Sequence, residues 1–463
     1  MYERWQNQEE ALQFSLQHPS CMLDMDMGTG KTRVAIDAIF AREDVDRVLV
    51  VCPKAVVPVW RTNLEKFAPD DDWDVWDTQK GSVKVKAKVM SDWVKLSDAR
   101  KVICVVNYDV VWRSPMGEVV PMLDFDMVIL DESHRAKSAG SKVSKYLGML
   151  GRSIDYKMCL SGTPMANSPL DVYGQYRFLD PTIYGTNHNR FLQEYAIMGG
   201  PERRFVVGYK NQQELKEKFQ SIAYSCKMSD VSARLKLPEV LPPVEYNVQL
   251  PKKDMGTSKM LSKEFIAECE SGAVVVVNNV LVKMLRLQQI TSGFCVVQDD
   301  PLSDERMEEL STVKEDALVD ILKDLPDTEQ LVVFCVFQHD LDAIARAANK
   351  AGRESCELSG RRNELEDWKT AEGAVLAVQI QAGAEGVDMT CAHHAVYFSL
   401  PHSLALYDQS KARLYRPGQT RPVSFIHLIA TGTIDEIMYN SLIKKRNIIE
   451  GIKNGAVDFG LLK

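Results

Sequence analysis

The chain has 463 residues, 45% of them hydrophobic and 26% charged, and its formal net charge at pH 7 is −8. This length exceeds what one hydrophobic core usually organises, and the absence of low-complexity tracts excludes an extended disordered tail, so we expect two folded domains. The acidic balance argues against indiscriminate binding of polyanions, so any nucleic-acid site is expected to be a local groove.

Ten cysteines are scattered singly, with no Cys-x-x-Cys pair and no zinc-like spacing with histidine. Several lie inside apolar runs, as Cys52, Cys104 and Cys335 do, and are expected to be buried, reduced thiols. No apolar stretch approaches the roughly 18 residues of a membrane span, and the first residues lack the layout of a signal peptide. The sequence therefore predicts a cytoplasmic protein without membrane contact.

The segment CMLDMDMGTGKTRVAIDAIF predicts a short strand, a glycine-containing loop and a helix. The loop residues are Gly28, Thr29, Gly30, Lys31 and Thr32. Backbone amides at the start of the helix are suited to cradle phosphates, with Lys31 reaching the β and γ phosphates and the Thr32 hydroxyl binding Mg²⁺. The strict phosphate-loop motif is not met, because Met25 occupies the position of its first glycine. An ordinary glycine turn that opens a helix is the alternative interpretation.

Further β-branched runs recur through the first half, with helical patterns between them. Such runs are typical of central strands in a parallel sheet, which are buried on both faces. The runs are RVLVVCP (47–53), KVICVVNY (101–108), DMVILDES (126–133) and YKMCLSGTP (156–164). The first half is therefore predicted to be an α/β lobe.

One of these runs ends in two carboxylates, Asp131 and Glu132. The carboxyl edge of a parallel sheet is where ligands bind, so Asp131 suits the water shell of Mg²⁺ and Glu132 suits the base that orients the attacking water. Taken alone, such a pair is usually a solvated loop start. Its position downstream of the phosphate loop favours the ATP interpretation.

After Pro181 the pattern changes to helices interrupted by glycine and proline, which is typical of insertions and a linker. The predicted helices are Phe191–Tyr195, Gln212–Phe219 and Ser258–Glu270. We place the boundary between the two domains, residues 1–240 and 241–463, within this region.

An α/β pattern returns from residue 313, with helices predicted at Lys314–Lys323 and 339–350. The predicted strands are QLVVFCVF (330–337), GAVLAVQ (373–379), HHAVYFSL (393–400) and VSFIHLIA (423–430). The second half is therefore a second α/β lobe. His393 and His394 begin one of these strands, but no third ligand stands at a sensible spacing, which argues against a metal site.

Gln409, Arg413 and Arg416 follow one another at i, i+4 and i+7 in DQSKARLYRPGQTR, which predicts one face of a helix. Arginines in such a place are suited to stabilise charge on a γ-phosphate, as arginine fingers do. A basic, solvated helix is the alternative.

Together these segments resemble the Swi/Snf-type ATPases, DNA translocases of helicase superfamily 2, in their compact bacterial or viral form. The resemblance runs in order along nearly the whole chain, from RWQNQEEAL to GTIDEIM. It implies two RecA-like parallel-sheet lobes in tandem with helical insertions between them. It also implies ATP and Mg²⁺ as cofactors.

The resemblance carries further residue roles. Gln8 is expected to contact the adenine, and Gly386 and Asp388, in QIQAGAEGVDM, to lie near the ribose and the lobe interface. Another set, which includes the segment LSGTPMANSPLDVYGQYRFLDP, is expected to couple nucleotide state to contacts with the track. Its members are His134, Ser161, Gly162, Thr163 and Gln409.

Contacts with a nucleic-acid backbone are expected near strand ends, and VLVVCPKAVVPVWRTNLEKF is similar to a motif with which the family contacts DNA. The candidates are Lys54, Trp60, Arg61, Asn107, Tyr108, Ser359 and Arg361. Core packing is an equally good interpretation of Trp60. No helix-turn-helix, zinc finger or RNA-binding sheet signature is present, so binding is predicted to tolerate any sequence.

The function hypothesis is therefore an ATP-dependent motor that acts as a monomer and translocates on double-stranded DNA. A strand-separating DNA or RNA helicase of the same superfamily is one alternative. An ATP-gated DNA-binding clamp is another, although Glu132, Arg413 and Arg416 favour turnover over clamping.

Overall fold

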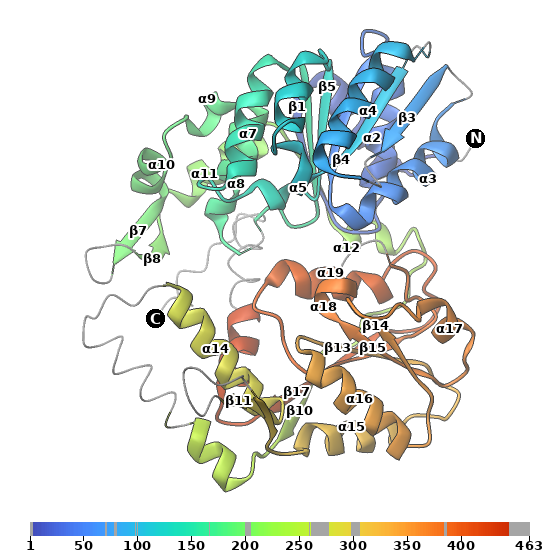
Figure 1. Cartoon of the computed structure of the whole chain (residues 1–463), viewed down its shortest axis with the longest axis vertical. Coiled ribbons are helices and arrows are strands. Elements are labelled where there is room, and N and C mark those ends of the chain that lie inside the picture. The colour runs from blue at the N-terminus through green and yellow to red at the C-terminus, as the bar shows by residue number, and fades with distance from the viewer. Residues whose placement is uncertain are drawn as a thin grey trace. The chain divides into compact units, whose positions relative to one another are not determined.

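The computed structural model describes residues 3–69, 72–77, 81–97, 99, 101–165, 167–199, 205–258, 260, 277–297, 306–383 and 387–443. Within these residues the chain divides into two compact units, the first ending at Leu235 and the second beginning at Lys236 (Figure 1). No helix in this part of the chain is long and apolar enough to cross a membrane.

The first unit contains a seven-stranded sheet in which every neighbouring pair is parallel. In spatial order its strands are β3 (Trp73–Asp77), β4 (Lys101–Asn107), β2 (Arg47–Cys52), β5 (Met127–Asp131), β6 (Tyr156–Ser161), β1 (Ser20–Met25) and β9 (Ala223–Cys226). The four runs predicted in the first half form β2, β4, β5 and β6, so the predicted α/β class is confirmed. Burial is nearly continuous along these strands, because both faces of a parallel sheet are covered.

The order β5, β6, β1 in this sheet positions the candidate site. Parallel pairing places Asp24 of β1 opposite Ser161 of β6, and Asp131 of β5 opposite Leu160 of β6. The carboxyl ends of three strands that are distant in sequence therefore lie side by side at one sheet edge.

Helices accompany this sheet and form the insertion that follows it. The α-helices are α1 (Gln6–Gln17), α2 (Lys31–Ala41), α3 (Val57–Phe67), α4 (Val83–Leu96), α5 (Tyr108–Val111), α6 (Met116–Val119), α7 (Lys142–Leu150), α8 (Val172–Leu179), α9 (Pro181–Tyr184), α10 (His188–Tyr195), α11 (Gln212–Gln220) and α12 (Met228–Ser232). Short 3-10 turns occupy Lys54–Val56, Val120–Met122, Ser133–Ala136, Gly151–Ser153 and Pro169–Asp171.

The insertion packs around aromatic rings. The Phe191 ring lies 4.9 Å from that of Tyr173 and 5.0 Å from that of Tyr195, between centroids. The predicted helices at 191–195 and 212–219 correspond to α10 and α11. The hairpin of β7 (Ala196–Gly199) and β8 (Phe205–Tyr209) was not predicted, and most of the predicted helix Ser258–Glu270 lies outside the described residues.

The second unit is built on a six-stranded sheet, again parallel throughout. Its order is β10 (Val244–Val248), β17 (Ser424–Ala430), β16 (His394–Tyr397), β13 (Leu331–Cys335), β15 (Val375–Gln379) and β14 (Ser355–Leu358). Its helices are α14 (Val277–Thr291), α15 (Val313–Asp324), α16 (Gln338–Lys350), α17 (Leu365–Thr370), α18 (Ile380–Gly383) and α19 (Leu404–Leu414). A small antiparallel pair, β11 (Phe294–Val297) and β12 (Arg306–Glu309), lies outside this sheet. The fold is therefore two α/β units in tandem, as predicted.

Candidate functional site

The loop between β1 and α2 has the backbone of a phosphate cradle. Gly28 and Gly30 have φ values of 83° and 97°, a left-handed conformation that glycine adopts without strain. Met25, at the position of the strict motif's first glycine, still belongs to β1. An extended residue needs no glycine, which explains why the loop forms despite its departure from the motif.

The Lys31 side chain folds back over this loop. Its Nζ donates to the carbonyl oxygen of Met25 at 2.9 Å and lies 3.5 Å from that of Asp26. Lys31 is only 8% exposed, whereas Thr32 beside it is half-buried. The ammonium is therefore held inside the loop, on acceptors that phosphate oxygens can replace.

Gln8 lies against the same loop. Its Nε2 is 3.4 Å from the carbonyl oxygen of Thr29, to which Asn7 Nδ2 also donates at 3.0 Å. A Cβ added to Gly30 would stand 2.1 Å from Gln8 Nε2, so this glycine is required for the close approach as well as for its φ. The expected adenine contact is thus placed beside the loop by α1.

Asp131 ends β5 as a buried residue that accepts three hydrogen bonds, two on its carboxylate and one on its main-chain carbonyl oxygen. Its Oδ2 accepts from Trp60 Nε1 at 2.8 Å, its Oδ1 accepts from the Glu132 amide at 2.9 Å, and its carbonyl oxygen accepts from the Tyr108 hydroxyl at 2.9 Å. Burial, and then the neighbouring Glu132 charge, raise the pKa of Asp131 to about 6, although the Trp60 hydrogen bond and Lys31 oppose this. An oriented carboxylate in such surroundings is stabilised when a cation arrives.

Glu132 and His134 connect the acidic pair to the next strand. Glu132 has a φ of 51°, which is costly for a residue with a side chain and is a feature of functional sites. His134 Nδ1 lies 3.3 Å from Glu132 Oε2 and 3.4 Å from Ser161 Oγ, and Ser161 Oγ also accepts from the Thr163 amide at 3.1 Å. One imidazole therefore contacts both segments.

Gln175 of α8 makes a second connection that the sequence did not single out. Its Oε1 accepts from Ser133 Oγ at 2.7 Å, and its Nε2 donates to the Pro164 carbonyl at 2.7 Å. A Cβ on Gly162 would be 3.2 Å from the Met25 carbonyl oxygen, so this segment also packs on the phosphate loop. The only sequence signal for Gln175 is a polar residue on the buried face of a helix.

The residues just before the phosphate loop also hold the end of the first unit. Asp26 Oδ2 accepts from the Met228 amide at 2.8 Å, and Asp24 Oδ2 accepts from Ser225 Oγ at 3.1 Å. Because β9 and α12 are the last strand and helix before Lys236, these contacts connect the loop to the chain that leaves the unit.

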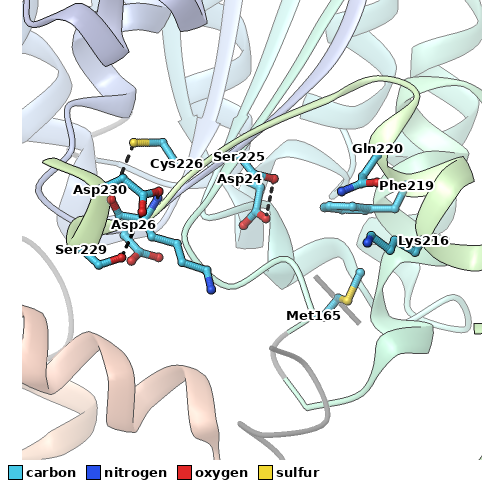
Figure 2. A pocket seen from close by; sticks show the side chains of 11 residues that line it. Asp24, Asp26, Met165, Lys216, Phe219, Gln220, Ser225, Cys226, Ser229 and Asp230 are labelled. Atoms are coloured by element: carbon cyan, nitrogen blue, oxygen red, sulfur yellow. Dashed lines mark hydrogen bonds between the residues drawn. The ribbon is translucent and has the colours of Figure 1, made fainter. Parts of the chain in front are cut away.

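A polar pocket of about 350 Å³ adjoins this region. Figure 2 shows the carboxylates of Asp24 and Asp26 on one side of it and Lys216 on the other. Neither Lys31 nor Asp131 lines the pocket, so the pocket lies beside the phosphate-loop lysine and is not the candidate triphosphate site.

Three of the expected DNA contacts need correction. Trp60 is 0% exposed, Asn107 4% and Tyr108 5%, so none offers a surface to a DNA backbone. Trp60 and Tyr108 are bonded to Asp131 instead, and Asn107 Oδ1 accepts from the Asp109 amide at 3.1 Å at the start of α5. Trp60 and Tyr108 therefore contact the end of β5, and Asn107 caps α5.

The remaining expected contacts are accessible. Lys54 is exposed in the turn after β2, and the partly exposed Arg61 pairs with Asp77 at 2.9 Å. In the second unit, Arg361 Nε pairs with Glu357 at 2.8 Å, and Ser359 donates to the same carboxylate.

The arginines of the second unit are placed differently from the expectation. Gln409 and Arg413 lie on α19 and are 5% and 7% exposed, but the helix ends at Leu414, so Arg416 is not on its face. Pro417 follows, and a residue before proline is driven out of the helical conformation. Arg416 Nη1 instead donates to the Val387 carbonyl at 3.2 Å.

The structure describes only part of the segment QIQAGAEGVDM, in which Gly386 and Asp388 were expected to lie near the ribose. Asp388 is exposed, and its Oδ1 accepts from the Thr390 amide at 3.1 Å, which forms a local turn. Gly386 lies outside the described residues.

Two family models match the chain, and the first extends beyond Leu235 into the second unit. A model of the SNF2-related domain matches residues 1–293, and one of the helicase conserved C-terminal domain matches residues 313–418. The chain is 24% identical to the mouse (Mus musculus) protein named DNA annealing helicase and endonuclease ZRANB3, with 97% of this chain and 40% of that protein covered. It therefore spans about two fifths of this relative's length.

A phage protein and a solved structure are similar over most of their own lengths. Putative protein p41 of Acyrthosiphon pisum secondary endosymbiont phage 1 is 25% identical, with 91% of this chain and 92% of that protein covered. The structure of the Sulfolobus solfataricus SWI2/SNF2 ATPase core in complex with dsDNA has 22% identity and a TM-score of 0.46, with 98% of this chain and 94% of that chain covered.

Proposed function

The chain belongs to the SNF2-related family, and on this premise we propose that it hydrolyses ATP and uses the free energy to translocate along double-stranded DNA without sequence specificity. The observation that carries this proposal is the convergence of Lys31, Asp131 and Glu132 at one edge of a parallel sheet. The names of relatives that act on DNA support the choice of track.

The donor groups at this edge fit a magnesium-bound triphosphate. The Asp131 carboxylate and the Thr32 hydroxyl are hard oxygen donors of the kind that Mg²⁺ prefers. The left-handed backbone of Gly28 and Gly30 allows successive amides of the loop to donate hydrogen bonds to phosphate oxygens. When bound, the metal ion supplies positive charge to the β and γ phosphates.

In the proposed hydrolysis, each of these side chains has one role. Lys31 exchanges its carbonyl acceptors for phosphate oxygens, and Glu132 orients the attacking water and accepts its proton. Arg413 and Arg416 are assigned to the charge that develops on the γ-phosphate. Electrostatic stabilisation of this kind usually supplies the largest part of such catalysis.

We propose that His134 couples ATP hydrolysis to DNA contacts, because its side chain lies between Glu132 and Ser161. Any shift of Glu132 during hydrolysis changes its 3.3 Å contact with His134, and therefore the position of Ser161. Asp26 offers a second route, because it bonds both the phosphate-loop region and α12. We assign DNA backbone contacts to the exposed Lys54, Arg61 and Arg361.

The test measures phosphate release from ATP with single-stranded DNA, duplex DNA, branched DNA and RNA. We expect duplex DNA to raise the rate and Lys31→Ala to abolish it, whereas Lys88→Ala, an exposed lysine on α4, serves as the matched control. A rate that duplex DNA does not change, or that Lys31→Ala leaves intact, contradicts the proposal.

Displacement of a third strand from a DNA triplex distinguishes translocation from its alternatives. Unwinding of a fork without triplex displacement supports a strand-separating helicase. Tight ATP binding with almost no turnover supports a clamp, and in that case Glu132→Gln leaves the slow rate unchanged.

A further inference from the structure

Three side chains with nitrogen and oxygen ligand atoms lie close together at the amino-terminal edge of the second unit's sheet. Glu329 lies just before β13, His394 is the first residue of β16, and His393 immediately precedes it. Parallel pairing of these strands places Leu331 opposite His394. Glu329 and the two adjacent histidines, which are distant from it in sequence, therefore meet at the amino-terminal edge of the sheet.

The three side chains are close enough to share one ion. One ligand atom from each lies within 4.8 Å of the other two. His393 Nδ1 is 3.2 Å from Glu329 Oε2, and the two imidazole centroids are 4.0 Å apart, with the rings inclined by 50°. Ligands of a tetrahedral ion lie about 3.3 Å apart when each stands about 2.0 Å from the metal, so small rotations about side-chain bonds suffice.

We propose that Glu329, His393 and His394 form a binding site for a divalent transition-metal ion of the zinc class. Two imidazole nitrogens and one carboxylate oxygen are a donor set that zinc accepts, with a fourth position left for water. Imidazole donors disfavour Mg²⁺ and Ca²⁺, which prefer oxygen alone.

Neighbouring residues hold the ligands as outer partners of a metal site do. Ser424 Oγ lies 2.6 Å from His394 Nδ1, which leaves Nε2 of that ring as the ligand atom. Arg421 Nη2 binds Glu329 Oε1 at 2.6 Å, which leaves Oε2 toward the histidines. The Arg421 side chain is 56% exposed, so water screens much of its repulsion of a bound cation.

Such an ion would join the loop before β13 to the first residues of β16. It would stabilise the folded second unit, because a ligand that binds only the folded chain shifts the folding equilibrium. The site uses no residue assigned to ATP or DNA, so its existence does not depend on the proposed function.

The experiment uses the whole chain, stripped of metal by a chelator and titrated with Co²⁺, whose visible absorption reports coordination. We expect one ion per chain, displaced by Zn²⁺, and a thermal midpoint that Zn²⁺ raises. Glu329→Gln and His394→Asn should each weaken Co²⁺ binding by at least about tenfold, since even loss of an outer partner costs that much.

Glu372→Gln and His18→Asn, which remove the same groups elsewhere, are the controls and should bind as the unaltered chain does. Equal affinity in all variants, or no binding at stoichiometric Co²⁺, overturns the proposal. An intense sulfur-to-cobalt band overturns it too, because that band assigns the ion to a cysteine such as the exposed Cys391. Glu329→Gln preserves side-chain size, so the test remains decisive if His394→Asn does not fold.

Discussion

Among the described residues, burial raises the pKa of Asp131 in the first unit and of Asp340 in the second to about 6, yet the two carboxylates have different surroundings. Asp340, 0% exposed in the first turn of α16, accepts from Ser399 Oγ at 2.6 Å and from the Phe337 amide at 3.3 Å. Ser399 Oγ in turn accepts from the Val336 amide at 2.8 Å. This aspartate belongs to a network that closes a strand-to-helix turn.

Asp131 has a second carboxylate beside it, on a residue with a left-handed backbone. A nearby lysine lowers the pKa of both aspartates, Lys31 that of Asp131 and Lys314 that of Asp340, so it does not distinguish them. Placing like charges together at a buried edge is costly unless a ligand compensates for them. The comparison teaches that a raised pKa alone does not identify a site, whereas the neighbours of the group do.

Asp131→Asn should show the largest difference between the two aspartates in ATP hydrolysis and stability. We expect ATP hydrolysis to fall at least about 100-fold, because charge that the transition state needs is lost. The free protein should become more stable by up to about 3 kcal/mol at pH 7, since a pKa raised from 3.8 to about 6 penalises the ionised carboxylate. That penalty is complete above about pH 6 and disappears as the pH falls toward 3.8, so the stability gain should vanish there. Steady-state phosphate release and urea unfolding measure both effects.

Asp340→Ala should gain less stability than Asp131→Asn. Removal of this carboxylate also lifts the penalty on an ionised group whose pKa is raised to about 6, but it leaves the buried Ser399 hydroxyl and Phe337 amide without this acceptor, which costs about 1 to 3 kcal/mol. Urea unfolding measures the difference between the two variants, and the ATPase rate per folded molecule should change less than about threefold, within roughly 0.7 kcal/mol. A gain equal to that of Asp131→Asn, or a large loss of rate, would break the comparison.

Trp60→Phe tests whether the indole tunes Asp131. Its hydrogen bond lowers the pKa of Asp131, so its removal should raise that pKa and move the acid limb of the ATPase profile to higher pH. We expect a rate loss of about tenfold at pH 7, or roughly 1.4 kcal/mol.

The matched control for Trp60→Phe is Trp368→Phe. Trp368 is an equally buried tryptophan whose Nε1 donates to the Ala374 carbonyl at 3.1 Å in the second unit. Its loss should lower stability without moving the pH profile. Identical profiles for the two variants would argue against the tuning role of Trp60.

His134→Ala should produce the smallest effect. Loss of the imidazole breaks the connection between Glu132 and Ser161, so the ratio of DNA-stimulated to basal ATPase should fall about threefold, roughly 0.7 kcal/mol. Parallel assays with and without duplex DNA measure the ratio. An unchanged ratio contradicts the coupling role of His134 and leaves the contacts of Asp26 as the proposed route.

Local pattern was sufficient for much of this protein. Apolar runs predicted the central strands of both sheets, because burial on both faces leaves a continuous hydrophobic signal. Shorter edge strands such as β3 and β14 carry less of that signal and were not predicted. The sequence also identified Lys31, Asp131 and Glu132, because each lies in a short local motif whose residues are adjacent in the chain.

The sequence by itself therefore determined the α/β class and the phosphate-loop and acidic-pair segments. Only the tertiary structure decided that Trp60 bonds Asp131, that Asp26 holds Met228, and that Glu329 joins two histidines that lacked a third ligand nearby in sequence. The physical reason is that strand order, and not spacing along the chain, sets which strand ends lie side by side. Those adjacent strand ends determine which side chains can form a hydrogen bond or share a metal ion.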